Sequence, residues 1–129
     1  MKRFIALALV SLVVVLSSWS EEHADLPTEF AFTPPPTPTN LSAVPGPERC
    51  TLSWSYPAEA LPLISEFRVY EYYGDYDLLQ LVGTTSETTF VDTLLIGNLY
   101  YCYKVSAVDA NGFEGWRTED ECAFVTTQP

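Results

Sequence analysis

The chain has 129 residues and a formal net charge of −11, from six basic and seventeen acidic side chains. Its length allows one domain of ordinary size. Its acidity argues against nucleic acids and anionic lipid surfaces as partners, because both carry negative charge.

The first twenty residues, 1–20, have the pattern of a secretory signal peptide. Lys2 and Arg3 form a short positive region, an apolar run occupies residues 4–16, and Ser18 and Ser20 supply the small residues that a signal peptidase needs. We therefore predict cleavage after Ser20 and an exported chain, secreted or periplasmic, with no membrane insertion after cleavage. An uncleaved anchor is the alternative, although the run is shorter than the ~20 residues of a spanning helix.

Residues 21–39 are acidic at first and then rich in proline, with the run Thr-Pro-Pro-Pro-Thr-Pro-Thr. Such a segment lacks apolar periodicity and favours extended polyproline II, so we predict a disordered spacer. A ligand for a proline-binding groove is the alternative. The folded domain is predicted for residues 40–129, which is small enough for a disulfide to matter. Asn40-Leu41-Ser42 is a glycosylation sequon, relevant only in a eukaryotic host.

Short alternating runs separated by turn residues fill the rest of the chain, without helical periodicity. A strand repeats every two residues, so alternate side chains can enter a core. The clearest run is 100–108, where Tyr101, Tyr103, Val105 and Ala107 share one face before an Asp-Ala-Asn-Gly turn. The predicted strands are residues 41–44, 50–54, 67–72, 78–82, 88–91, 100–108 and 122–127. Seven strands at this spacing predict an all-β antiparallel sandwich.

Three pieces of this region resemble the fibronectin type III domain. Leu52-Ser53-Trp54 stands where that family has its core tryptophan, and Phe67-Arg68-Val69-Tyr70 resembles its third strand. Residues 90–107 resemble its pattern Tyr-x-Asp…Leu…Tyr-x-Tyr-x-Val-x-Ala, with Gly-Asn in place of the usual Pro-Gly. The resemblance implies a seven-stranded immunoglobulin-like sandwich over residues 40–128. It also implies that Tyr101 is the corner tyrosine, whose hydroxyl returns to nearby backbone.

The three cysteines are not part of that family pattern. In the family fold the last strand pairs with the strand 100–108, so strand parity places Cys102 and Cys122 together on the outward face. Opposed cross-strand Cβ atoms are about 4.5–5.5 Å apart, close to what a disulfide needs. We therefore predict Cys102–Cys122 as the only disulfide and Cys50 as a reduced core residue. A metal site is the alternative, but the only histidine, His23, falls in the spacer.

The sequence gives no pattern for catalysis, because the histidine lies outside the predicted domain and the serines lack a base. We expect no cofactor and no metal. We interpret the acidic side chains as charges exposed to solvent in loops and at the edges of the sheets. Loose calcium binding by Asp75 and Asp77, or by Asp109 and Asn111, is the alternative, although neither pair has the spacing of an EF-hand loop.

Outward aromatic residues are the one indication of function. The candidate ligand-binding residues are Tyr70, Tyr72, Lys104, Phe113 and Trp116. Tyrosine and tryptophan are enriched at binding surfaces and also stack on sugars, although ordinary cross-strand packing would explain them too. We expect a monomeric, exported, non-catalytic module for protein–protein interaction or spacing, with an unidentified extracellular protein or glycan as partner. An accessory carbohydrate-binding sandwich is the alternative.

Overall fold

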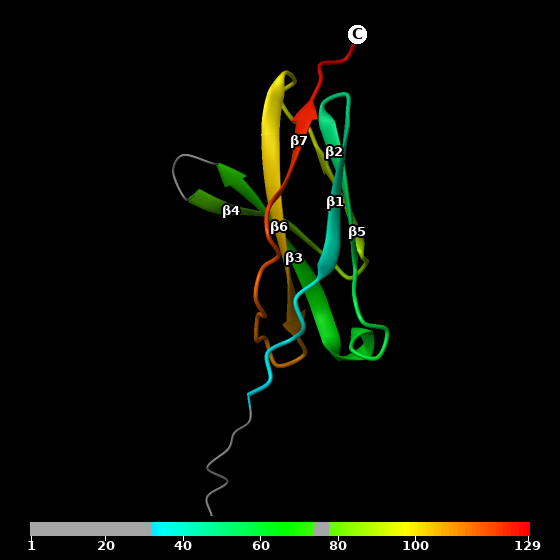
Figure 1. The fold of residues 1–129 in the computed structure, drawn as a ribbon, viewed down its shortest axis with the longest axis vertical. Helices are drawn as coiled ribbons and strands as arrows, with labels where there is room; N and C mark the ends of the chain where they lie inside the picture. Colours follow the sequence, from blue (N-terminus) through cyan, green and yellow to red (C-terminus); the bar gives the residue numbers. More distant parts are fainter. Residues whose placement is uncertain (1–31, 74–77) are drawn as a thin grey trace, which may run out of the picture. The chain divides into compact units, whose positions relative to one another are not determined.

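Seven strands in two sheets make up the part of the chain that the computed structural model describes, residues 32–73 and 78–129 (Figure 1). In chain order they are β1 (Thr39–Gly46), β2 (Arg49–Ser55), β3 (Ile64–Tyr73), β4 (Leu78–Thr85), β5 (Thr89–Thr93), β6 (Leu99–Asp109) and β7 (Glu121–Val125), with a short 3-10 helix, η1 (Leu61–Leu63), before β3. One sheet has the order β1-β2-β5 and the other β4-β3-β6-β7, and the paired strands are antiparallel. The predicted all-β antiparallel sandwich is confirmed.

Alternating side chains from the two sheets form the core. On β2, Cys50, Leu52 and Trp54 are buried, and on β6 the odd-numbered residues 101–107 are buried. Trp54 packs edge-on against Phe67 of β3, with ring centroids 5.4 Å apart. Aromatic pairs in this geometry add about 0.5–1.5 kcal/mol beyond the burial of their area. The inward faces predicted from the alternation are therefore those that pack together.

Tyr101 closes the turn that leads into β6. Its hydroxyl donates to the carbonyl oxygen of Ile96 at 3.0 Å and accepts from the N–H of Ile96 at 2.8 Å. In the same turn Asn98 has a φ of 64°, the left-handed region that asparagine tolerates because its short polar side chain can bond locally. Tyr101 thus has the corner role that the resemblance implied.

The proline-rich end of the predicted spacer packs on the sandwich. Pro35 and Pro38 are buried, and a Cβ at Gly115 would collide with the carbonyl oxygen of Pro35. The compact unit accordingly runs from Thr33 to Pro129. The folded part therefore begins before the expected Asn40, because buried prolines can anchor an extended segment that has no apolar periodicity to reveal it.

Within residues 32–73 and 78–129, no helix combines the length and apolar character needed to cross a membrane. The predicted signal peptide, its cleavage after Ser20 and the acidic part of the predicted spacer lie outside the described residues.

Candidate functional site

Cys102 and Cys122 form a disulfide across the β6–β7 pair. They are directly opposite each other in the strand register, with their Cα atoms 4.0 Å apart. The bond closes a loop that contains the whole connection between β6 and β7. The structure therefore contains the predicted pairing, on the face of the sheet that points away from the core.

Cys50 is free and completely buried. Burial, together with the negative charge of Asp92, raises the pKa of its thiol to about 11. A thiol with such a pKa stays protonated at neutral pH, and the protonated form is a poor nucleophile. Cys50 is thus a core residue, as predicted.

Tyr70 is not exposed, and the prediction that it faces solvent is wrong. Strand parity does place it on the outer face of β3, but the residue is only 7% exposed. The guanidinium carbon of Arg117 lies 4.4 Å from the centroid of its ring, and its hydroxyl donates to Glu114 at 2.5 Å. Because the connection between β6 and β7 folds over this face, the ring of Tyr70 is covered and cannot stack on a ligand.

Glu114 contacts side chains from β3, from β6 and from the β6–β7 connection to which it belongs. Its Oε1 accepts hydrogen bonds from the hydroxyls of Tyr70 and Ser106, the latter at 2.6 Å. Its Oε2 accepts from the guanidinium of Arg68 at 3.0 Å, and Arg117 Nε lies 3.8 Å from Oε1. Burial alone would raise the pKa of this carboxyl, but the two hydroxyl donors and two guanidinium groups outweigh burial and lower the pKa. The ionised carboxylate therefore fixes the connection to the sheet.

Asp109 shapes the turn that follows β6. Its Oδ1 accepts from the N–H groups of Asn111 at 2.9 Å and Phe113 at 3.0 Å. This carboxylate oxygen is therefore occupied by backbone donors, as expected of a turn residue. The other suggested calcium pair, Asp75 and Asp77, lies outside the described residues.

The β6–β7 connection presents two aromatic side chains to solvent. Trp116 is 77% exposed and Phe113 is 49% exposed. The backbone near them is fixed, because the N–H groups of Gly115 and Thr118 donate to carbonyl oxygens of β6 at 2.8 and 2.9 Å. Both aromatic side chains therefore lie outside the core, as the sequence predicted, and they stand on ordered backbone.

Tyr72 and Lys104 lie on the outer faces of the neighbouring strands β3 and β6. Lys104 Nζ is 5.8 Å from the centroid of the Tyr72 ring, within the range of a cation–π interaction. Tyr72 is opposite Cys102 in the register. These two candidates are therefore partly buried beside the disulfide, whereas the two exposed candidates, Phe113 and Trp116, belong to the connection.

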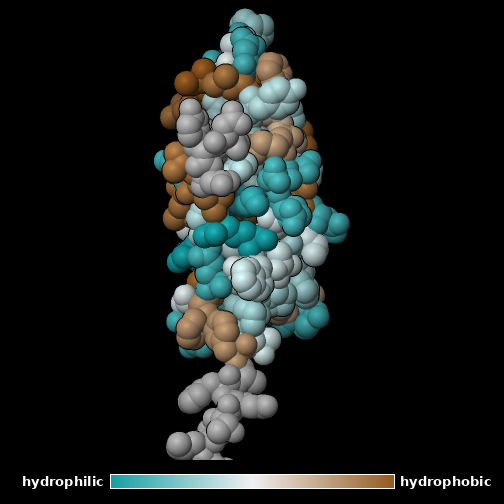
Figure 2. Space-filling view, turned by 60° about the vertical axis from the view of Figure 1, so that its left-hand side comes forward, coloured by the Kyte–Doolittle hydropathy of each residue, from teal (hydrophilic) through white to brown (hydrophobic). Residues whose placement is uncertain are grey.

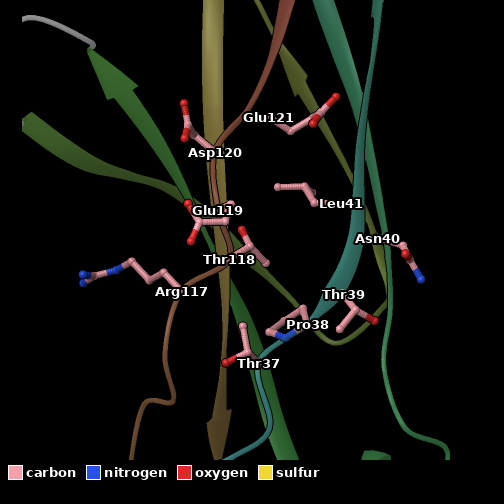
Figure 3. A pocket seen from close by; sticks show the side chains of 10 residues that line it. All are labelled: Thr37, Pro38, Thr39, Asn40, Leu41, Arg117, Thr118, Glu119, Asp120 and Glu121. Atoms are coloured by element: carbon pink, nitrogen blue, oxygen red, sulfur yellow. The ribbon is translucent and has the colours of Figure 1, made fainter.

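An open groove of about 380 Å³ lies between the chain that enters β1 and the segment that enters β7 (Figure 3). Residues 37–41 and 117–121 line it. Leu41 and Glu121 point into the groove from opposite sides, and Arg117 points away from it. The buried Thr118 is already engaged, since its Oγ1 accepts from the N–H of Val105 at 3.0 Å. The lining contains none of the five candidate ligand-binding residues.

In the described part of the chain, Cys102, Asp120 and Cys122 bring their ligand atoms close enough together to hold a metal ion. The two sulfur atoms are bonded to each other, so neither can act as a thiolate ligand. This group gives no support for a metal site.

Sequence reasoning missed the cluster around Glu114. Strand parity identified Tyr70 but gave no reason to bring a loop carboxylate over it. One signal was available: only four basic residues follow residue 20, against seventeen acidic ones. So few cations in an acidic chain are expected to be paired, and Arg68 and Arg117 both pair with this one carboxylate.

Solved structures share this arrangement of strands. A Fn3-like protein from Clostridium thermocellum matches 75% of this chain and 99% of its own, with 24% identity and a TM-score of 0.61. The third fibronectin III domain of the human KIAA0343 protein matches 74% of this chain and 86% of its own, with 16% identity and a TM-score of 0.59. The chain has a fibronectin type III fold.

This fibronectin type III fold also occurs inside larger proteins. A β-1,2-glucanase from Parabacteroides distasonis matches 76% of this chain but only 14% of its own, with 18% identity and a TM-score of 0.62. No family model matches the chain, and no curated protein matches it. The identities are below 25%, so the similarity concerns the fold.

Proposed function

We propose that this chain is an exported, non-catalytic binding module that contacts another extracellular protein through its β6–β7 connection. The fibronectin type III fold is in general that of a non-enzymatic module, although a fold alone does not name a ligand. The disulfide supports export, because disulfides persist mainly in oxidising compartments.

The observation that carries the proposal is the exposure of Trp116 on an ordered connection. An indole ring that is 77% exposed leaves a large apolar area in water. Binding energy usually concentrates in a few such aromatic anchors. Glu114, two residues earlier, ties the connection to β3 and β6, so less conformational freedom is lost when a partner binds. Phe113 adds a second exposed ring on the same connection.

A carbohydrate-binding sheet face is less well supported than a protein contact. That alternative relied on Tyr70, Tyr72 and Trp116 as stacking platforms. The ring of Tyr70 is covered by Arg117, and the ring of Tyr72 is partly buried beside Lys104. Trp116 alone remains as an open aromatic plane.

The test compares Trp116→Ala with Tyr100→Ala. Tyr100 is a matched control, because it is also highly exposed, at 74%, but belongs to the start of β6. Each full-length variant is immobilised and incubated with the exported fraction of the source organism, and the captured proteins are identified by mass spectrometry. We expect the wild type and Tyr100→Ala to capture the same protein and Trp116→Ala to lose it.

Other results would contradict the proposal. Equal capture by all three proteins would exclude Trp116 as the anchor. Capture of no protein, combined with retardation in a polysaccharide affinity gel that Trp116→Ala abolishes, would assign a glycan instead. Neither capture nor retardation would favour a spacer, for which only length and stiffness matter.

A further inference from the structure

The groove between residues 37–41 and 117–121 lies where two edge strands separate. β1 is an edge of one sheet and β7 is an edge of the other. They are joined just beyond their C-terminal ends, where Pro47 pairs with Thr126 and the N–H of Glu48 donates to the carbonyl oxygen of Thr126 at 2.9 Å. In the described part of the chain no other main-chain pairing connects the two strands. Toward their N-terminal ends they leave the groove of about 380 Å³, a volume within the range of ligand sites, about 300–1,000 Å³.

The main chain of β7 offers hydrogen-bonding groups on the side of this groove. Cys122 is directly opposite Cys102 of β6, with a Cα–Cα distance of 4.0 Å. In an antiparallel pair, such close residues, about 4.5 Å apart, exchange no main-chain hydrogen bonds, whereas bonded residues are about 5.5 Å apart. The N–H and C=O groups of Cys122 therefore point away from β6, toward the edge of the sheet that faces β1. An extended chain laid along this edge can pair with them as an added strand.

Charge indicates which kind of chain fits the groove. Leu41 and Glu121 point into it from opposite sides, and the three acidic residues 119–121 belong to its lining. The lining has one basic residue, Arg117, which points away from the groove with its guanidinium over the ring of Tyr70. In Figure 2 hydrophilic side chains cross the middle of the visible face and apolar ones gather toward its upper end, so the middle of the molecule suits a polar partner. The groove thus offers negative charge beside the apolar Leu41, which complements a basic segment.

A metal ion fits these carboxylates less well than a basic peptide does. Among the described residues, the group of metal-ligating side chains whose ligand atoms come close together is Cys102, Asp120 and Cys122, and its two sulfur atoms are bonded to each other. The carboxylates of residues 119–121 do not converge on one point but follow the chain. Cationic side chains of an extended peptide are spread in the same way, because a strand advances about 3.3 Å per residue.

We propose that the groove binds an extended segment of another exported protein, rich in lysine or arginine, which adds to the edge of β7 as a strand and places a cationic side chain beside Glu121. The net charge of −11 draws such a segment toward the chain, and main-chain pairing then fixes it in the groove. The groove is lined by neither Phe113 nor Trp116, so this inference goes beyond the function proposed for them and does not rest on it.

The test uses a fluorescein-labelled peptide, Lys-Val-Lys-Val-Lys-Val-Lys, and measures its binding to the full-length chain by fluorescence anisotropy in about 0.05 M NaCl, where charge is weakly screened. We expect saturable binding with a Kd below about 1 mM. Two further peptides have the same charge but carry N-methyl groups, one on the valine nitrogens and the other on the lysine nitrogens. Each lacks the donors of one edge, so one of the two should bind about tenfold more weakly, through the loss of main-chain hydrogen bonds.

Variants of the chain test the location. Glu121→Gln should weaken binding about threefold, the effect of losing one ion pair near the surface, and Thr39→Lys should weaken it at least as much by placing a like charge in the lining. Glu48→Gln and Thr51→Lys are the matched controls, because they make the same changes of charge at exposed positions outside the groove. These controls should leave the Kd within about 1.5-fold.

Three results would overturn the proposal. Absence of saturable binding up to about 1 mM would show that the groove does not bind a basic strand. Equal weakening by the groove variants and their controls would reduce the interaction to the net charge of the chain. Unchanged affinity for both methylated peptides would exclude strand addition. Circular dichroism checks that the variants fold, and Glu121→Gln or Thr39→Lys is sufficient if the other does not.

Discussion

Glu114 is the residue on which the order of the outer face depends, and its charge gives the protein a specific pH dependence. Its ordinary pKa of 4.5 is lowered in the folded chain. Folding therefore favours the ionised form, so the contribution to stability is complete above the ordinary pKa and is lost as the pH falls through the lowered pKa. We expect Glu114→Gln to cost about 1.5–3 kcal/mol near neutral pH, the range for hydrogen bonds to a charged group.

The measurement is urea denaturation followed by tryptophan fluorescence, from neutral pH down to about 3, which is below the ordinary pKa of a glutamate. The difference in free energy of unfolding between the wild type and Glu114→Gln should shrink as the pH falls. Burial raises the pKa of Asp92, so the contribution of Asp92 to stability has the opposite pH dependence. Both proteins contain Asp92, so this contribution cancels when their free energies of unfolding are subtracted. Glu119→Gln, at an exposed position in the same connection, is the control. A constant difference at all pH values would show that the Glu114 charge is not the stabilising feature.

Two aromatic residues near Glu114, the buried Tyr70 and the exposed Trp116, should differ sharply in their contribution to stability. Tyr70→Ala removes a buried ring together with its bond to Glu114, and we expect a loss of about 3 kcal/mol or more. Trp116→Ala removes an exposed ring and should change the free energy of unfolding by less than about 0.5 kcal/mol. Chemical denaturation of the two variants measures both values. Equal losses would mean that the connection does not cover Tyr70 in solution.

The side of the sheet on which a residue lies could be predicted from the sequence, but its exposure could not. Period-two alternation correctly placed Trp54 and Tyr101 in the core and Tyr70 on the outer face. The β6–β7 connection covers this outer face through Glu114 and Arg117, and its sequence has no periodicity from which the cover could be predicted. Such tertiary contacts between a loop and a strand leave no local pattern in the chain.

At the scale of elements, the bond between β6 and β7 should contribute a measurable part of the stability. The cysteines are separated by 20 positions, and closing a loop of that length is worth about 3 kcal/mol in the chain-entropy estimate. We therefore expect Cys102→Ser with Cys122→Ser to lower the free energy of unfolding by about that amount. Reductant should destabilise the wild type similarly and leave the double variant unchanged. A double variant as stable as the wild type would contradict this role.

The strands themselves were the most predictable elements, because each carries its own alternation. β6 was expected over residues 100–108 and occupies Leu99–Asp109. β3 was expected from residue 67 and begins at Ile64, since its first residues pair with β6 before the alternation becomes regular. Pairing partners fix the ends of a strand, and the partners are distant in the sequence.

At the scale of the whole molecule, the proline-rich segment should behave as part of the domain. Gly115→Ala would drive a Cβ into the carbonyl of Pro35, so the segment before β1 should detach and the domain should lose stability. Gly112→Ala is the control: its φ of 85° also disfavours a side chain, but the space around it is open. NMR relaxation of the Thr33 and Thr37 amides should show fast motion in Gly115→Ala only. Mobile amides in the wild type would exclude the packing.

The disulfide beside the β6–β7 connection separates changes in exposed residues of the connection from changes in the core of the sandwich. The disulfide Cys102–Cys122 ties β6 to β7 outside the core. The exposed side chains of the connection, Phe113 and Trp116, can therefore be replaced without repacking the sheets, whereas Glu114 and Gly115 cannot. Each doubling of a closed loop costs only about 0.6 kcal/mol. The contact residues around Trp116 can therefore diversify rapidly over generations while the sandwich stays nearly constant, and new ligands become accessible without a new fold.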